Sequence, residues 1–229
     1  MHYLTVFDLD GTLVDTPRAI VETFDAAFGA MNLAPPDASA IRATIGLPLE
    51  QAFAGLLALP PDDGRVAAGV RHYQAQFKEI ILPRAPALIF PRVEEGLDVL
   101  HRLGITLAIA TSKFAASADA LLRAAGLRDR FELVVGADQV THPKPHPESG
   151  RLVLRTLGIA ADRAVMVGDT VHDIHMATAA GLRSIAVTYG VHGPAELAAA
   201  GPTWIADTFD EVVARIETHL RAAPEGLAG

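Results

Sequence analysis

Short apolar runs alternate with segments of helical periodicity along most of the 229-residue chain. Compact apolar runs lie at residues 105–110, 133–135, 164–167 and 184–188, and another lies ahead of them at 3–7. Strands that alternate with helices are typical of βαβ crossovers, which place parallel strands in one sheet covered by helices on both faces. The pattern therefore predicts an α/β fold with a doubly wound parallel sheet.

The segment between the first apolar run and the later ones has a different pattern. From about residue 16 to residue 82 the apolar residues recur at helical spacing, with breaks such as Pro35-Pro36 and Pro60-Pro61. We expect three or four helices here and no strand. The chain is therefore predicted to form a sheet-based core from residues 1–15 and 83–229, with an inserted helical domain at 16–82.

Composition excludes several classes of function. A net charge of −8 leaves no basic face for a nucleic-acid backbone, and the lack of cysteines excludes disulfides, thiolate zinc sites and a thiol nucleophile. The first residues do not form a signal peptide, and no apolar run is long enough to span a membrane. We therefore expect a cytoplasmic protein without nucleic-acid or membrane partners, and a frayed end over residues 221–229.

Chemically useful side chains follow four of the predicted strands. Ligands of open α/β sheets bind beyond the carboxyl ends of the strands, so we expect these side chains to lie close together. In chain order they are Asp8, Asp10, Thr111, Ser112, Lys113, Lys144, Asp169 and Asp173.

Each of these segments has a simpler interpretation when it is taken alone. Asp8 and Asp10 could begin a calcium loop, but an EF-hand needs Gly at its sixth position and Glu at its twelfth, where the chain has Leu13 and Ala19. Asp-Gly is also a turn signal, and Thr and Ser commonly cap helices. Turns and caps do not explain acids, hydroxyls and a lysine at four strand ends, so we favour a single site.

Together, the four segments resemble the haloacid dehalogenase superfamily of phosphatases. Asp-x-Asp-Gly-Thr matches residues 8–12, Thr111-Ser112 matches the second motif, Lys144 the third, and residues 168–173 match Gly-Asp-x-x-x-Asp. The similarity is greatest to phosphoglycolate phosphatases and their pyrophosphatase relatives. It implies a Rossmann-like core in which residues 16–82 are an α-helical cap domain.

The resemblance also implies a reaction, the hydrolysis of small, phosphoglycolate-like phosphate monoesters through an aspartyl-phosphate, with Mg²⁺ as cofactor. Asp8 would be the nucleophile, and Asp10 the general acid and then the general base. An acid at the position of Asp10 distinguishes phosphatases of this superfamily from dehalogenases and phosphonatases. Asp8, the Asp10 carbonyl and Asp169 would bind Mg²⁺, and Asp173 would bind it directly or hold a metal-bound water.

The same resemblance assigns the phosphoryl-binding groups. Lys144 would balance the charge around Asp8 and act in catalysis together with Thr111. In the helical insertion, Arg42 and the loop Gly46-Leu47-Pro48 are candidates for contact with the leaving group. The predicted substrate-binding residues are Gly11, Thr12, Thr111, Ser112, Lys144 and Arg42.

Other functions remain open from the sequence. The chain could be a pyrophosphatase, a phosphotransferase resembling β-phosphoglucomutase, a receiver-like phospho-aspartate signalling module or an inactive binding protein. Receivers carry their phosphorylated Asp after the third strand and have no large helical insertion. His142, His146, His172 and His175 could bind a transition metal, but the acids favour an oxygen-liganded cation. We expect a small phosphorylated metabolite as the partner, and a monomer or homodimer.

Overall fold

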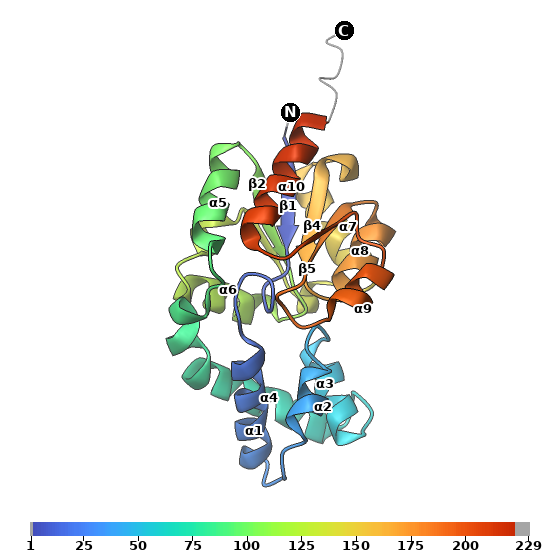
Figure 1. Ribbon diagram of the computed structural model, residues 1–229. Helices are drawn as coiled ribbons and strands as arrows, with labels where there is room; N and C mark the ends of the chain where they lie inside the picture. The colour runs from blue at the N-terminus through green and yellow to red at the C-terminus, as the bar shows by residue number, and fades with distance from the viewer. Residues whose placement is uncertain (1, 223–229) are drawn as a thin grey trace.

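The computed structural model describes residues 2–222, and in this part of the chain six parallel strands form one sheet (Figure 1). The strand order is β3-β2-β1-β4-β5-β6, so the first strand lies in the middle of the sheet. The strands are β1 (Leu4–Phe7), β2 (Thr106–Ala110), β3 (Leu133–Val135), β4 (Ala164–Gly168), β5 (Arg183–Val187) and β6 (Trp204–Ala206).

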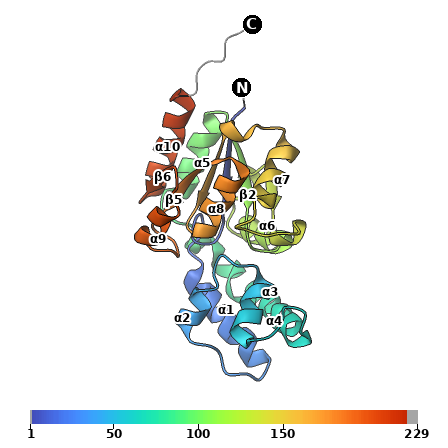
Figure 2. The same cartoon turned by 90° about the vertical axis from the view of Figure 1, so that its right-hand side faces the viewer.

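Helices cover both faces of the sheet. Successive side chains of a strand point to opposite faces, and those of β1 and β4 are buried throughout, so both faces need cover. Phe7 points into a core shared with α5 (Val93–Arg102) and α10 (Phe209–Ala222), and Val6 points into a second core shared with α7 (Glu148–Leu157) and α8 (Val171–Ala180). Figure 2 shows the two layers on opposite sides of the strands. The remaining α-helices of the sheet-based part are α6 (Ala115–Ala124) and α9 (Pro194–Ala199). The predicted doubly wound α/β fold is confirmed.

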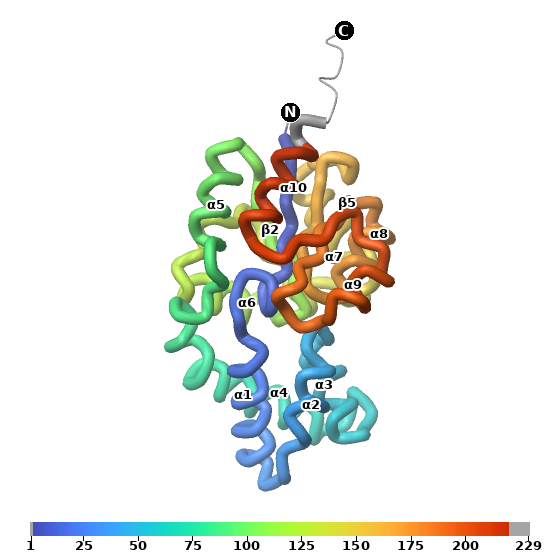
Figure 3. The backbone as a smooth tube through the Cα atoms, viewed as in Figure 1, coloured from blue at the N-terminus to red at the C-terminus, as the bar shows by residue number. Residues whose placement is uncertain are grey.

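Between β1 and α5 the chain leaves the sheet, forms a group of helices at the end of the molecule, and returns (Figure 3). The two connecting segments lie side by side, because Val14 pairs with Ile89 in an antiparallel bridge. The predicted helical insertion without strands is confirmed, whereas its bounds at residues 16–82 stay a prediction. Its helices are α1 (Pro17–Ala30), α2 (Ala38–Arg42), α3 (Leu49–Leu57) and α4 (Gly64–Ile80), and a 3₁₀ helix, η1 (Leu82–Leu88), follows.

The sequence pattern predicts five strands, and the structure adds β6 at the edge of the sheet. This strand has only three residues, Trp204, Ile205 and Ala206, and Ile205 is exposed. So short an apolar run does not distinguish a strand from other elements. Of the end predicted to be frayed, residues 223–229 lie outside the described residues. None of the helices within residues 2–222 has the length and apolarity that a membrane span requires.

Aromatic packing holds the helical insertion together. The ring of Phe53 lies 4.9 Å from that of Phe24, 5.7 Å from that of Phe28 and 6.3 Å from that of Tyr73, measured between centroids. A Cβ atom on Gly69 would lie only 2.5 Å from the Phe53 ring, so glycine allows α4 to approach α3 closely. Phe53 itself is fully buried, which makes it the centre of this cluster.

We predict that Phe53→Ala lowers the free energy of unfolding by about 3–5 kcal/mol, because it removes a buried ring and leaves a cavity among three others. Urea denaturation followed by circular dichroism measures the change. Leu33→Ala is the matched control, since Leu33 is 42% exposed and its truncation should cost no more than about 0.5 kcal/mol. Equal losses for the two variants would contradict this view of the packing.

Candidate active site

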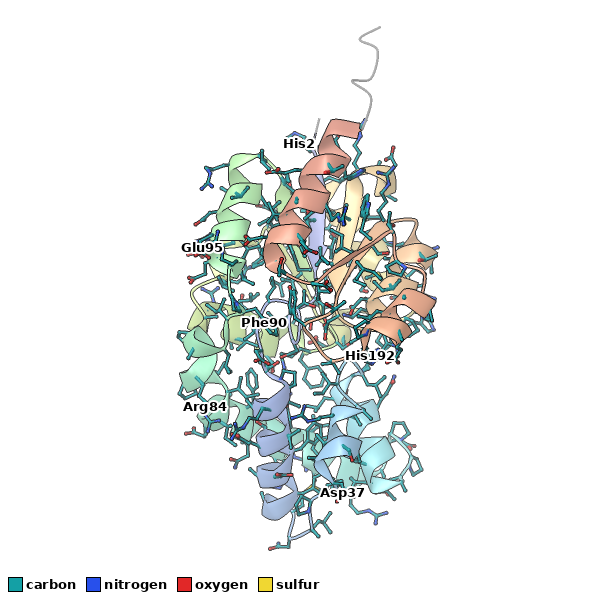
Figure 4. All side chains as sticks on the ribbon, in the orientation of Figure 1. His2, Asp37, Arg84, Phe90, Glu95 and His192 are labelled. Carbon is teal, nitrogen blue, oxygen red and sulfur yellow. The ribbon has the colours of Figure 1, made fainter. Side chains whose placement is uncertain are left out.

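The polar strand ends converge at the carboxyl edge of the sheet, which faces the helical insertion. Asp8 follows β1, Thr111 follows β2 and Asp169 follows β4, and these three strands are neighbours with β1 between the other two. Phe90 and His192, both labelled in Figure 4, mark the level at which this edge meets the insertion. The sheet order therefore brings together segments that are more than 150 residues apart in sequence, such as those containing Thr12 and Asp169.

A buried cluster of three carboxylates and one lysine occupies this edge. Asp8, Asp169 and Asp173 each offer a carboxylate oxygen, and these atoms all lie within 4.8 Å of one another. The Lys144 ammonium lies 2.6 Å from Asp173 Oδ1 and 3.1 Å from Asp8 Oδ1, and it donates a hydrogen bond to the carbonyl of Ala110 at 3.2 Å. One buried cation therefore faces three buried acids.

The shifts in pKa follow from this imbalance. Burial raises the pKa of Asp8 to about 6; Lys144 opposes this rise, and Asp173 and Asp10 add to it. Burial, together with the charges of Asp8 and Asp173, raises the pKa of Asp169 well above its usual range. Burial alone would lower the pKa of Lys144, but Asp173 and Asp8 outweigh it and raise that pKa, so Lys144 stays charged.

The cluster fits a hard divalent cation. Asp8 Oδ1 is buried and receives no hydrogen bond from the described residues, although the Lys144 ammonium is nearby. Asp169 accepts hydrogen bonds from uncharged donors only, the hydroxyl of Thr12 at 2.8 Å and the amide of Val191 at 2.8 Å. Carboxylate oxygens whose charge is incompletely neutralised are suitable ligands for Mg²⁺ or Ca²⁺, so a metal at this place is chemically consistent with the residues present.

Asp173 differs from the other two acids because hydrogen bonds occupy both of its oxygens. Oδ1 accepts from Lys144, and Oδ2 accepts from the amide of Thr170 at 3.1 Å and from its hydroxyl at 2.7 Å. The contact with Thr170 is also the capping box that begins α8. Asp173 therefore connects Lys144 to the start of that helix.

A tight turn after β1 explains the glycine in the first motif. Gly11 has a φ of +79°, and a Cβ atom there would lie 2.2 Å from Asp169 Oδ2, so both the backbone angle and the space require glycine. The amide of Gly11 donates to the Val14 carbonyl, and that of Thr12 donates to the Leu9 carbonyl. Gly11 and Thr12, both predicted to bind substrate, therefore use these amides within the turn, and the Thr12 side chain holds Asp169.

Asp10 lies at the wall of a cavity and has two partners. Its Oδ1 accepts a hydrogen bond from the Thr16 hydroxyl at 2.6 Å, and its Oδ2 lies 3.0 Å from the Lys113 ammonium. That ammonium also lies 5.0 Å from the centre of the Phe77 ring. Lys113 is absent from the predicted catalytic, substrate-binding and metal-binding residues, although its position directly after Thr111-Ser112 is a signal that could have identified it.

The second motif joins the sheet to the helical insertion. Thr111 is buried, and its hydroxyl accepts a hydrogen bond from the amide of Lys113 at 3.2 Å. The Ser112 hydroxyl donates to the carbonyl of Gly46 at 2.6 Å, which closes one side of the cavity. Both predicted residues therefore lie beside Asp8 and Asp10, where the two parts of the chain meet.

The cavity between the insertion and the sheet edge is lined by only part of the predicted site. Gly11, Thr12, Lys144, Asp169 and Asp173 are not among its lining residues. Gly46 and Leu47 line it from the insertion side as expected, but Pro48 does not. Arg42 is exposed at the end of α2 and is not among the lining residues either. From the sheet edge, Asp8, Asp10, Thr111 and Ser112 line it. Tyr73, Gln74 and Phe77 of α4 also line it, but their helical spacing does not distinguish them from ordinary core residues.

The four histidines considered for a transition metal do not form one group. His142 and His146 lie beside Glu148 on the surface, with the Nδ1 atom of His142 3.1 Å from the Glu148 carboxylate. His172 is half-buried, and burial lowers its pKa, whereas His175 is exposed. The buried carboxylates thus remain the better candidate for a catalytic metal.

Comparisons with known proteins agree with this geometry. The family described as haloacid dehalogenase-like hydrolase matches residues 5–187. The chain is 56% identical to probable phosphatase IndB of Dickeya dadantii over 96% of both chains, and 30% identical to phosphoglycolate phosphatase of Colwellia psychrerythraea over 91% of this chain and 94% of that one. A crystal structure of a haloacid dehalogenase-like hydrolase from Bacteroides fragilis matches with a TM-score of 0.83 and 27% identity, covering 93% of this chain and all of that one.

The family match covers residues 5–187, the sheet carries the expected helical insertion, and three buried acids lie together at its carboxyl edge. The chain therefore belongs to the haloacid dehalogenase-like hydrolases and is a phosphatase of that superfamily.

Proposed function

We propose that the chain hydrolyses small phosphate monoesters in a Mg²⁺-dependent reaction that proceeds through an aspartyl-phosphate on Asp8. The observation that carries the proposal is the position of Asp8, a buried carboxylate on the cavity wall beside the Lys144 ammonium and the second acid, Asp10. A phosphate monoester repels an anionic nucleophile, so the attack needs nearby positive charge and a partner for proton transfer.

The reaction takes two displacements at phosphorus. In the first, an Asp8 oxygen forms a bond to phosphorus while the bond to the leaving oxygen breaks, and Asp10 gives that oxygen a proton. In the second, Asp10 takes a proton from a water molecule as the water attacks phosphorus, which releases inorganic phosphate and restores Asp8. The hydrogen bond from Thr16 and the Lys113 ammonium hold the Asp10 carboxylate at the cavity wall between the two steps.

The surrounding residues keep this nucleophile charged and positioned. Asp8, Asp169 and the Asp10 carbonyl would hold Mg²⁺, which supplies charge neutralisation for the phosphoryl oxygens. Hydrogen bonds to both oxygens of Asp173 support a role in positioning Lys144 and ordering water, in preference to direct metal binding. Thr111 lines the cavity together with Asp8, and the Lys144 ammonium lies 3.1 Å from Asp8 Oδ1, so both would contact the phosphoryl group.

The helical insertion, residues 16–82, is proposed to act as a cap domain that excludes water and selects the leaving group. The hydrogen bond between Ser112 and the Gly46 carbonyl supports this role, because it joins the cap to the motif that binds the phosphoryl group. A cytoplasmic location and a monomeric or homodimeric state stay predictions.

Phosphoglycolate is the first candidate substrate, because relatives about 30% identical over most of the chain are named phosphoglycolate phosphatases. Pyrophosphate is a second candidate, since a relative that is 29% identical is named pyrophosphatase. A mutase resembling β-phosphoglucomutase would need a bisphosphate activator, whereas a phosphatase releases inorganic phosphate steadily without one. A receiver-like module would instead keep its phosphoryl group without turnover.

A phosphate-release screen tests the proposal with phosphoglycolate, pyrophosphate, sugar phosphates, nucleotides and 4-nitrophenyl phosphate. We expect Mg²⁺-dependent release, and we expect Asp8→Asn to lower kcat by at least about 10³-fold, because the amide cannot act as the nucleophile. Asp25→Asn is the control, since Asp25 is an exposed acid of α1 and its variant should keep wild-type turnover. Wild-type turnover by Asp8→Asn would exclude the covalent mechanism.

Metal binding can be tested without measuring activity. Mg²⁺ at about a hundredfold excess over its dissociation constant should stabilise the folded protein by about 2.7 kcal/mol, which raises the midpoint of thermal unfolding by several degrees. Asp169→Asn should lose this response, because it removes one of the buried carboxylates, whereas the exposed Asp162→Asn should keep it. If Asp169→Asn were stabilised by Mg²⁺ as much as the wild type, the metal would bind at a different site.

A further inference from the structure

The wall of the cavity contributed by the helical insertion differs in character from the charged sheet edge. We infer that this wall receives an uncharged leaving group that carries an apolar ring, so that the preferred substrates are phosphate esters of neutral cyclic alcohols, and carboxylate-bearing esters such as phosphoglycolate are disfavoured. The inference rests on the proposed function and deepens it. Sequence similarity places phosphoglycolate first among the candidate substrates, and the chemistry of the cavity moves it behind esters of neutral alcohols.

Apolar and aromatic side chains form most of this wall. Phe24 lies on α1, and Tyr73 and Phe77 lie one helical turn apart on α4, with the ring of Phe24 4.8 Å from that of Tyr73. Leu47 and Phe114 extend the apolar surface toward the sheet edge. A neutral ring placed here would bury apolar surface, which is worth roughly 25 cal/mol per Å², and would stack against aromatic faces.

The positive charge that lines the cavity already has an acidic partner. Among the described residues that line it, Lys113 is the only cation, and its ammonium lies 3.0 Å from Asp10 and above the ring of Phe77. A carboxylate on the leaving group would compete with Asp10 for this ammonium and would lie among apolar side chains. Such a group loses hydration without gaining the bidentate partner that an arginine provides, and Arg42 is exposed outside the cavity.

The polar groups of the wall are neutral, as a neutral polar ligand requires. Thr44 and Gln74 offer one hydroxyl and one amide, and Ser117 of α6 adds a second hydroxyl to the cavity. The Thr44 hydroxyl donates to the carbonyl of Ile41 at 2.7 Å, so it can still accept a hydrogen bond from a ligand. These groups can recognise hydroxyl, carbonyl or amide substituents on a ring, but none of them neutralises an anion.

A matched pair of substrates tests the inference, namely benzyl phosphate and 4-carboxybenzyl phosphate. Their leaving alcohols are similar in reactivity, and they differ by one carboxylate far from phosphorus. We expect kcat/KM to be at least about tenfold higher for benzyl phosphate, and higher for benzyl phosphate than for phosphoglycolate, because the cavity gives a carboxylate no partner. Equal or greater kcat/KM for either carboxylated ester would overturn the inference.

A variant pair tests the physical cause. Gln74→Arg introduces a cation into the wall and should shift the ratio of the two kcat/KM values by about tenfold or more toward 4-carboxybenzyl phosphate. Gln74→Met is the control, with similar length and no charge, and should keep the wild-type preference for benzyl phosphate. The ratio comes from one enzyme sample, so a partly unfolded fraction does not alter it. Thr44→Arg replaces Gln74→Arg if the latter does not fold.

The proposed function and this inference can fail separately. Hydrolysis of 4-nitrophenyl phosphate that depends on Asp8 supports the function regardless of which leaving group is preferred. If no ester is hydrolysed, or if Asp8→Asn is fully active, the proposed function fails. If 4-nitrophenyl phosphate is hydrolysed while benzyl phosphate is not, or while carboxylated esters are preferred, only the inference about the leaving group is overturned.

Discussion

The structure around the reaction centre depends on one buried ammonium group that several acids share. Lys144 reaches Asp8 at the end of β1, the Ala110 carbonyl at the end of β2 and Asp173 at the start of α8. Removing one partner of a buried ion pair typically costs about 3–5 kcal/mol, because the other charge is left without compensation. The same contacts that keep Asp8 charged therefore also fix the relative positions of two strands and a helix.

Close backbone approaches make this concentration of charge possible. Gly11 allows the turn after β1 to pass directly against Asp169, and Gly168 lies so close to Asp173 that a Cβ atom would be 2.4 Å from the Asp173 Cβ. One lysine does not neutralise three acids, and the surplus negative charge is what suits the cluster to a divalent cation. The helical insertion contributes a wall of mostly apolar side chains. In the proposed reaction, the charged cluster would bind the phosphoryl group and the apolar wall would select the rest of the substrate.

Much of this arrangement could be predicted from the sequence, because strand ends in a parallel sheet are fixed by topology. Asp8, Lys144 and Asp169 were predictable as neighbours, since each follows an apolar run and parallel strands end at one edge. The short edge strand β6 was not predicted, because an apolar run of only three residues does not by itself distinguish a strand from other elements. The helical insertion was predictable as helices, but the periodicity of an amphipathic helix does not say whether its apolar face meets the core or a ligand.

The finer roles depended on hydrogen bonds that a sequence does not specify. Gly11 and Thr12 match the family motif, yet their amides are used inside the turn and the Thr12 hydroxyl supports Asp169. Arg42 is a cation in the expected segment, but the helix directs it to solvent. Lys113 was visible in the sequence, and only its distance to Asp10 indicates its importance.

The central claim is that the buried carboxylate of Asp8 carries the phosphoryl group during turnover. The most direct test is to quench the enzyme with acid during hydrolysis of 4-nitrophenyl phosphate, reduce any acyl phosphate with borohydride, and locate the product by peptide mass spectrometry. An aspartyl-phosphate is reduced to homoserine, so the account predicts homoserine at residue 8 only in samples that received substrate. Homoserine at another position, or no reduced residue in an enzyme that is turning over, would contradict the account.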